Sequence, residues 1–139
     1  MTLTLNDIPR CLQGVIPSII ATSSAAGEPN VAHLSQVFFV DEHHVAASNQ
    51  FFSKTIANLA ANPLAMLVCP DPVDLVSYKI LVRHEGTQVE GPLFDAACAS
   101  IDAIAALTGM ADVFALKAMD VFRVLDIEAV PSRPLPRPL

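Results

Sequence analysis

The run of residues 49–55, Asn-Gln-Phe-Phe-Ser-Lys-Thr, carries the side chains of this chain that are best suited to holding an anion. It joins a strand-like segment to a helix-like segment that starts at Ser53. A helix N-terminus attracts phosphate because its first N–H groups are unpaired and its dipole favours negative charge. Lys54 is one of only eight Lys and Arg residues in the chain. We therefore predict that Ser53, Lys54 and Thr55 bind a phosphate group; the alternative is a plain turn in which Ser53 only caps the helix.

Motifs for other common site chemistries are missing from the sequence. The four histidines show no HExxH-type spacing, so no metal site is predicted. There is no GxSxG elbow of a serine hydrolase, and neither GxGxxG nor GxxxxGKS/T occurs. Cys11, Cys69 and Cys98 are odd in number and form no CxxC, which predicts reduced, mostly buried thiols in a cytoplasmic protein. The catalytic residues are therefore left unknown.

Composition limits the partners of the chain. With 139 residues, 53% of them hydrophobic, the chain suits one domain with a well-filled core. Only 16% of the residues are charged, which predicts an apolar face buried in a homodimer. The net charge of −6 and the absence of a basic stripe argue against nucleic-acid binding. No apolar window of about 18 residues predicts a membrane span, and residues 1–10 do not form a signal peptide.

Apolar patterning predicts six strands and two substantial helices. The predicted strands are residues 17–24, 30–40, 44–49, 64–69, 76–90 (with a bend or bulge at Gly86) and 120–130. The predicted helices are 53–62, with Ile56 and Leu59 inward, and 92–109, ended by Gly109. The inward positions of the second helix recur at helical spacing and are Leu93, Ala97, Ile101, Ile104 and Leu107. Short helices are also predicted near residues 6–12, capped by Asn6, and near 112–116.

The links between the predicted strands are short and suit hairpins. A regular alternation of strand and helix is missing, so a doubly wound parallel sheet is disfavoured. We predict a mainly β fold, a small antiparallel barrel with flanking helices, because closing the sheet removes the apolar edges. The barrel domain spans residues 1–130. Residues 131–139, with prolines at 131, 134, 136 and 138, are predicted to form an extended tail.

Several short patterns occur in an order that points to a known family. They are Gly14 to Pro17, Ile20 to Thr22, Gly27 to Pro29, Ser53 to Thr55, Asn58-Leu59 and Asn62-Pro63, followed by a long strand that reaches Glu85-Gly86-Thr87. Over about residues 8–130 the chain resembles the pyridoxamine 5′-phosphate oxidase-like FMN-binding split-barrel family. The resemblance implies a six-stranded antiparallel Greek-key split barrel that forms a homodimer and holds FMN in the two grooves between subunits.

The resemblance also implies which residues bind the cofactor. The family's Ser-Arg-Lys run, which binds the FMN phosphate, aligns with Ser53, Lys54 and Thr55, so one cation stands where the oxidases have two. Contacts to the flavin ring are implied for Ser35, Gln36 and Val37. Contacts near the phosphate and the ribityl chain are implied for Ser48 and Asn49.

The function that follows from the resemblance is flavin-dependent oxidoreduction of an unidentified small molecule. The oxidases themselves hold their substrate with C-terminal arginine and histidine residues; the tail of this chain has Arg133 and Arg137 but no histidine. True pyridoxamine 5′-phosphate oxidase activity is therefore not predicted. The alternative is a non-catalytic sensor or regulatory module that binds flavin or haem, and a haem or a deazaflavin in place of FMN is a further alternative.

Overall fold

One antiparallel sheet dominates the computed structural model of the chain, which describes residues 2–49, 54–109, 116 and 118–130. The strands are β1 (Ser18–Ser23), β2 (Pro29–Leu34), β3 (Val37–Asp41), β4 (His44–Asn49), β5 (Leu64–Pro70), β6 (Ser77–Gln88) and β7 (Ala118–Val130). The helices are α1 (Lys54–Ala61) and α2 (Pro92–Thr108), with two 3-10 helices, η1 (Leu5–Asp7) and η2 (Pro9–Leu12), near the N-terminus. The predicted mainly β architecture with flanking helices is confirmed.

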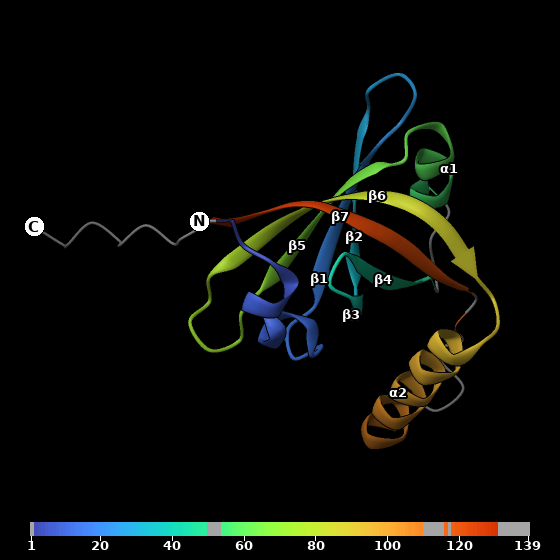
Figure 1. The fold of residues 1–139 in the computed structure, drawn as a ribbon. Helices are drawn as coiled ribbons and strands as arrows, with labels where there is room; N and C mark the ends of the chain where they lie inside the picture. The colour runs from blue at the N-terminus through green and yellow to red at the C-terminus, as the bar shows by residue number, and fades with distance from the viewer. Residues whose placement is uncertain (1, 50–53, 110–115, 117, 131–139) are drawn as a thin grey trace, which may run out of the picture.

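The sheet curls until its two edge strands almost meet. The strand order is β2-β1-β5-β6-β7-β4-β3, and every neighbouring pair is antiparallel. The edge strands β2 and β3 are consecutive in the chain and are joined by Ser35 and Gln36 alone. Two linking residues span at most about 11 Å from the last Cα of β2 to the first of β3, so the two edges lie close together where these strands are joined. Figure 1 shows the strongly curved sheet that results.

The predicted strand over residues 30–40 is wrong as one element, because it divides into β2 and β3, and the described chain has seven strands rather than six. Strict alternation would place Leu34 and Val37 on opposite faces, yet both are buried, at 2% and 0% exposed. The backbone therefore bends between them. The side chain of Gln36 stabilises the bend, since its Nε2 donates to the carbonyl of Leu12 at 3.0 Å.

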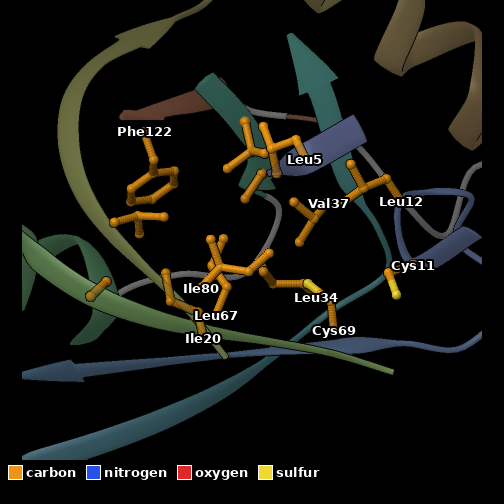
Figure 2. Close-up of a cluster of buried hydrophobic side chains, with 14 of the residues drawn as sticks. Leu5, Cys11, Leu12, Ile20, Leu34, Val37, Leu67, Cys69, Ile80 and Phe122 are labelled. Carbon is orange, nitrogen blue, oxygen red and sulfur yellow. The ribbon is translucent and has the colours of Figure 1, made fainter. Parts of the chain in front are cut away.

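The hydrophobic core fills the inside of the curved sheet and is closed by the N-terminal segment. Figure 2 shows Leu5, Leu12 and Val37 near one another, with Phe122 farther along the same cluster. The predicted helix over residues 6–12 is instead η1 followed by η2, because Pro9 supplies no N–H to continue a helix. The expected Asn6 cap is wrong: the carboxylate of Asp7 accepts a hydrogen bond at 2.8 Å from the N–H of Thr4, the residue that precedes η1.

The three cysteines are free thiols, as predicted. Cys11 and Cys69 belong to the core and are 3% and 0% exposed, whereas Cys98 on α2 is half-buried. Burial raises the pKa of the Cys11 thiol to about 12 and that of Cys69 to about 11. Both core thiols therefore stay protonated at neutral pH and pack as small apolar side chains.

The two helices bury less of their apolar surface than the sequence predicts. On α1, Leu59 is buried at 5% but Ile56 is 45% exposed, so the inward prediction for Ile56 is wrong. On α2, Ala97 and Ile101 are buried, whereas Leu107 is 89% exposed and its inward prediction is wrong. Figure 1 shows α2 extending away from the sheet.

The ends of α2 and the segment beyond it can be compared with the predictions only in part. Gly109 follows α2 with φ +69°, which confirms it as the C-terminal cap. The short helix predicted for residues 112–116 and the tail of residues 131–139 fall almost entirely outside the described residues. Neither of the two described α-helices is long and apolar enough to cross a membrane.

The long strands β6 and β7 carry an irregularity that positions polar side chains. Their register shifts between His84 and Gly86, which confirms the predicted bulge at Gly86. His84 lies opposite Phe122, and beyond the bulge Thr87 lies opposite Asp120. The bulge therefore brings residues of β6 on both of its sides near the start of β7.

Candidate functional site

The start of α1 is fixed against the β1–β2 hairpin by polar contacts. Asn58 Nδ2 donates to Thr22 Oγ1 at 3.1 Å, and both residues are buried. Asn30 Nδ2 lies 3.5 Å from Thr55 Oγ1, to which it donates. These contacts join the first two turns of the helix to β1 and β2, so the helix N-terminus has a defined position on the barrel.

Lys54 is the first residue of α1 and extends into solvent. Its side chain is 67% exposed, and its Nζ lies 3.7 Å from Oε1 of Glu28, whose side chain is 72% exposed. An exposed pair of this kind contributes little free energy, so the ammonium group is available to another anion. Thr55 differs, because it is only 2% exposed and its hydroxyl contacts Asn30.

A second pair of hydroxyl groups lies where β2 bends into β3. The Oγ atoms of Ser35 and Ser48 are 3.5 Å apart. Ser48 on β4 is buried, and Ser35 in the bend is exposed. The structure therefore brings together two of the predicted cofactor-binding residues, although no hydrogen bond links this pair to the start of α1 among the described side chains.

Gln36 and Val37 lie beside this serine pair but have structural partners. The side chain of Gln36 bonds to Leu12 and lies against Gly14, where a Cβ would come within 2.8 Å of Gln36 Oε1. Gly14 has φ +72°, so a glycine fits this position for both reasons. Val37 is completely buried, so neither its side chain nor its main chain is exposed to a ligand in this structure. Its strand, β3, is an edge of the sheet.

The remaining predicted residues are described in part or not at all. The backbone of Asn49 pairs with Ala118 at the end of β4; its side chain and all of Ser53 lie outside what the structure describes. The cofactor contacts assigned to the eight residues stay predictions.

A phosphate group fits the start of α1 chemically. The first four N–H groups of a helix lack partners within the helix, and the exposed ammonium of Lys54 adds a positive charge beside them. Glu28 is the unfavourable element, since its carboxylate would repel a phosphate. Both side chains are exposed, and an exposed pair contributes little free energy, so a phosphate could replace Glu28 as the partner of Lys54.

Sequence reasoning missed a second polar cluster, formed by His84 and Thr87 of β6 with Asp120 of β7. Asp120 Oδ1 lies 3.0 Å from His84 Nε2 and accepts a hydrogen bond from Thr87 Oγ1 at 2.7 Å. The rings of His84 and Phe122 meet in a T-shaped contact with centroids 5.3 Å apart. A signal was present in the sequence: an aspartate two residues before a core phenylalanine occupies a core-facing strand position.

Comparisons with known proteins address the fold. No protein-family model and no curated protein matches the chain. Among solved structures, an FMN-binding protein from Syntrophomonas wolfei subsp. wolfei superposes with TM-score 0.72 at 21% identity, covering 94% of this chain and 88% of that one. A putative pyridoxamine 5′-phosphate oxidase from Lactobacillus delbrueckii gives TM-score 0.62 at 15% identity, covering 91% and 93%. HutZ, the haem storage protein of Vibrio cholerae, gives TM-score 0.57 at 14% identity, covering 88% and 92%.

These likenesses show the fold. The chain has the split-barrel fold of pyridoxamine 5′-phosphate oxidase-like, FMN-binding proteins, as the sequence predicted. The similar structures include an FMN-binding protein and a haem storage protein, so the fold alone leaves the choice of cofactor open.

Proposed function

We propose that this chain binds FMN, with its phosphate at the N-terminus of α1, and acts as a flavin-dependent oxidoreductase on a small molecule. The observation that carries the proposal is the exposed ammonium of Lys54 at the first residue of a helix in a split barrel. Ser53 and the N–H groups of the first turn would complete the phosphate site. Bound FMN would supply hydride and electron transfer, so the chain itself needs no strong acid or base.

The remaining contacts follow the geometry of the β2–β3 bend. Ser35 and Ser48 would offer hydroxyl groups, and Val37, which is completely buried, would pack behind them on the edge strand β3. Gln36 would keep the bend in place through its bond to Leu12, and could reach a flavin ring only with its remaining amide atoms. Asn49, at the end of β4, would lie between this group and the phosphate.

We further propose that two copies of the chain form a homodimer that closes the flavin groove. Helix α2 is apolar around most of its circumference, yet it extends away from the sheet (Figure 1) and exposes Leu107 at 89%. A helix that is apolar on all sides is normally buried, so a second copy is the simplest cover. Light scattering should give the mass of a dimer at micromolar concentration, and a stable monomer would contradict the shared groove. A cytoplasmic location is proposed from the three free cysteines.

The decisive experiment identifies and then titrates the cofactor. Mass spectrometry of the ligand released on denaturation should detect FMN. Flavin fluorescence titration should then show that Lys54→Ala weakens FMN binding by about 1.5–3 kcal/mol, because a charge-assisted contact is lost. Lys79→Ala is the matched control, since Lys79 also forms an exposed pair, with Glu128 at 3.4 Å, on β6. Equal affinities for all three proteins would remove Lys54 from the site, and a failure to bind FMN would reject the proposal.

A change of opposite sign tests the same site. Glu28→Gln removes the carboxylate that lies 3.7 Å from Lys54 Nζ, so FMN should bind tighter, by about 0.5 kcal/mol for an exposed pair. Steady NAD(P)H consumption by the FMN-loaded protein would support an enzyme, whereas FMN binding without turnover would support the regulatory alternative.

Haem is the second candidate ligand, because HutZ, a haem storage protein, shares the fold. A sharp, intense absorption band in the purified protein would favour haem, and broad flavin absorption in the visible blue would favour FMN. In the haem case, Lys54→Ala should leave ligand binding almost unchanged unless Lys54 contacts a propionate group. The absorption spectrum and the effect of Lys54→Ala on ligand binding together distinguish FMN from haem.

A further inference from the structure

A small pocket lies between α1 and the β6–β7 pair, apart from the exposed start of α1. Its volume is about 190 Å³, and it is lined by Ile56, Leu59 and Ala60 of the helix and by His84, Thr87 and Asp120 of the strands. One wall is therefore apolar and the other is polar. Pockets for drug-sized ligands usually exceed about 300 Å³, so this one suits a smaller molecule.

The polar wall has a carboxylate that is incompletely hydrogen-bonded. Asp120 has a side chain only 4% exposed. Its Oδ1 contacts both His84 Nε2 and Thr87 Oγ1, at 3.0 and 2.7 Å, but its Oδ2 has no partner among the described residues. Because a buried carboxylate oxygen without a donor is unfavourable, Asp120 can accept a further hydrogen bond from a bound group.

The charges around the pocket favour a cation. Among the described residues, no lysine or arginine lines it, and His84 and Asp120 are the lining side chains that can ionise. Oδ2 has less than 1 Å² of exposed surface, so a donor in the pocket can reach it only after the Asp120 carboxylate turns toward the other lining residues. A modest rotation of the carboxylate would then present either oxygen.

The apolar wall of the pocket explains why two apolar side chains on α1 are exposed. Ile56 is 45% exposed although it follows the helical pattern of a core residue, and Ala60 one turn later is also exposed. Both side chains line the pocket instead of the core. A short alkyl group placed there would cover apolar surface that the protein itself leaves open.

We propose that this pocket binds a small primary alkylammonium ion. The ammonium group donates to the carboxylate of Asp120, a charge-assisted hydrogen bond that is stronger than a neutral one, and the alkyl chain packs against Ile56 and Leu59. This site does not depend on the proposed flavin function, because none of its lining residues belongs to the predicted cofactor site.

Titration with butylammonium chloride, followed by amide NMR spectra of the full-length protein, tests the proposal. Saturable shifts are expected at amides of α1 and β6 that line the pocket, beyond those caused by equal concentrations of sodium chloride. Asp120→Asn, which removes the charge and keeps the shape, should weaken binding about tenfold or more. Asp126→Asn is the matched control, since Asp126 lies exposed on the same strand, and it should bind like the unmodified protein.

A second variant keeps the test decisive if Asp120→Asn does not fold. Ala60→Phe fills the pocket from the exposed helix surface and leaves the carboxylate intact, so it should abolish the shifts. 1-Butanol, which has the same chain without the charge, should bind at least about tenfold more weakly than butylammonium. The proposal is overturned if the shifts are absent, lie outside the pocket, persist in Ala60→Phe, or are matched by 1-butanol.

Discussion

Two imidazole–carboxylate pairs occupy opposite faces of the same part of the sheet and differ mainly in burial. In the inner pair, His84 Nε2 lies 3.0 Å from Asp120 Oδ1, and the Asp120 side chain is 4% exposed. In the outer pair, His44 Nδ1 lies 2.8 Å from Asp41 Oδ1, and the Asp41 side chain is 57% exposed. A second carboxylate, Glu85, approaches His44 Nε2 at 3.1 Å.

The register of three strands explains why the pairs face opposite ways. Phe122 of β7 lies opposite both Val45 and His84, whereas its neighbour Arg123 lies opposite His44. Directly opposite residues share a face, and successive residues along a strand alternate. His84 therefore faces the core with Phe122, and His44 faces outward with Arg123.

The difference between the pairs shows how burial changes the role of an imidazole and a carboxylate in contact. In the outer pair, water and salt can replace either partner, so each contact is worth little. In the inner pair, water cannot reach Asp120 freely, so a lost donor is not replaced by a water molecule and the loss costs more free energy. The inner pair is expected to matter for stability and for ligand binding, and the outer pair for the response to pH.

The largest expected effect comes from removing the core side chain beneath the inner pair. Phe122 is completely buried and contacts the His84 ring. Phe122→Ala should lower the free energy of unfolding by about 3–5 kcal/mol, measured by urea unfolding. Arg123→Ala, one residue along and exposed, should change it by no more than about 0.5 kcal/mol. Similar losses in both variants would mean that the assignment of faces is wrong.

A smaller effect is expected from deleting one donor to the inner carboxylate. Thr87→Val keeps the shape of the side chain but removes the hydroxyl that lies 2.7 Å from Asp120 Oδ1. The free energy of unfolding should fall by about 1.5–3 kcal/mol, the worth of one hydrogen bond to a carboxylate, because Oδ1 keeps His84 as its other partner. Glu85→Gln removes a comparable contact of the outer pair, where Glu85 is 41% exposed, and should cost about 0–1 kcal/mol. An equal cost for both would show that burial does not separate the pairs.

The parts of this molecule that sequence reasoning predicted are those encoded by neighbouring residues. Residues 44–49 were predicted as a strand and form β4, and Gly109 ends α2 as expected. The bulge near Gly86 was also predicted, because a glycine interrupts a long apolar strand pattern. In each case the signal lies within a few residues of the element it predicts.

The features that sequence reasoning did not predict depend on contacts between segments that are distant in the chain. The break between β2 and β3 results from the side chain of Gln36 reaching Leu12, which no local pattern reveals. His84 and Asp120 are 36 residues apart and meet only because β6 pairs with β7 in one register. Lys54 was found as a candidate from its place in the chain, but its proximity to Glu28 required the β1–β2 hairpin to be folded.

The smallest expected effect concerns the outer pair and is a dependence on pH. The hydrogen bond that the His44 ring donates to Asp41 raises the pKa of His44 above its ordinary value of 6.5, and the charges of Asp41 and Glu85 act in the same direction. In turn, hydrogen bonds from the N–H of His43 and from the His44 ring lower the pKa of Asp41 below its ordinary value of 3.8, so the carboxylate stays ionised to lower pH.

The direction of the effect on stability follows from linkage. A group whose pKa is higher in the folded state stabilises the protein fully below its unfolded pKa, and this contribution is lost as the pH rises through the folded pKa. The unmodified protein should therefore exceed His44→Gln in free energy of unfolding by more at pH 5.5 than at pH 8.5. Urea unfolding at both pH values measures this difference, and NMR titration of the His44 ring in Asp41→Asn should show its pKa falling toward the ordinary value. A difference that grows with pH, or a His44 pKa unchanged in Asp41→Asn, would mean that the outer carboxylate does not hold the proton on His44.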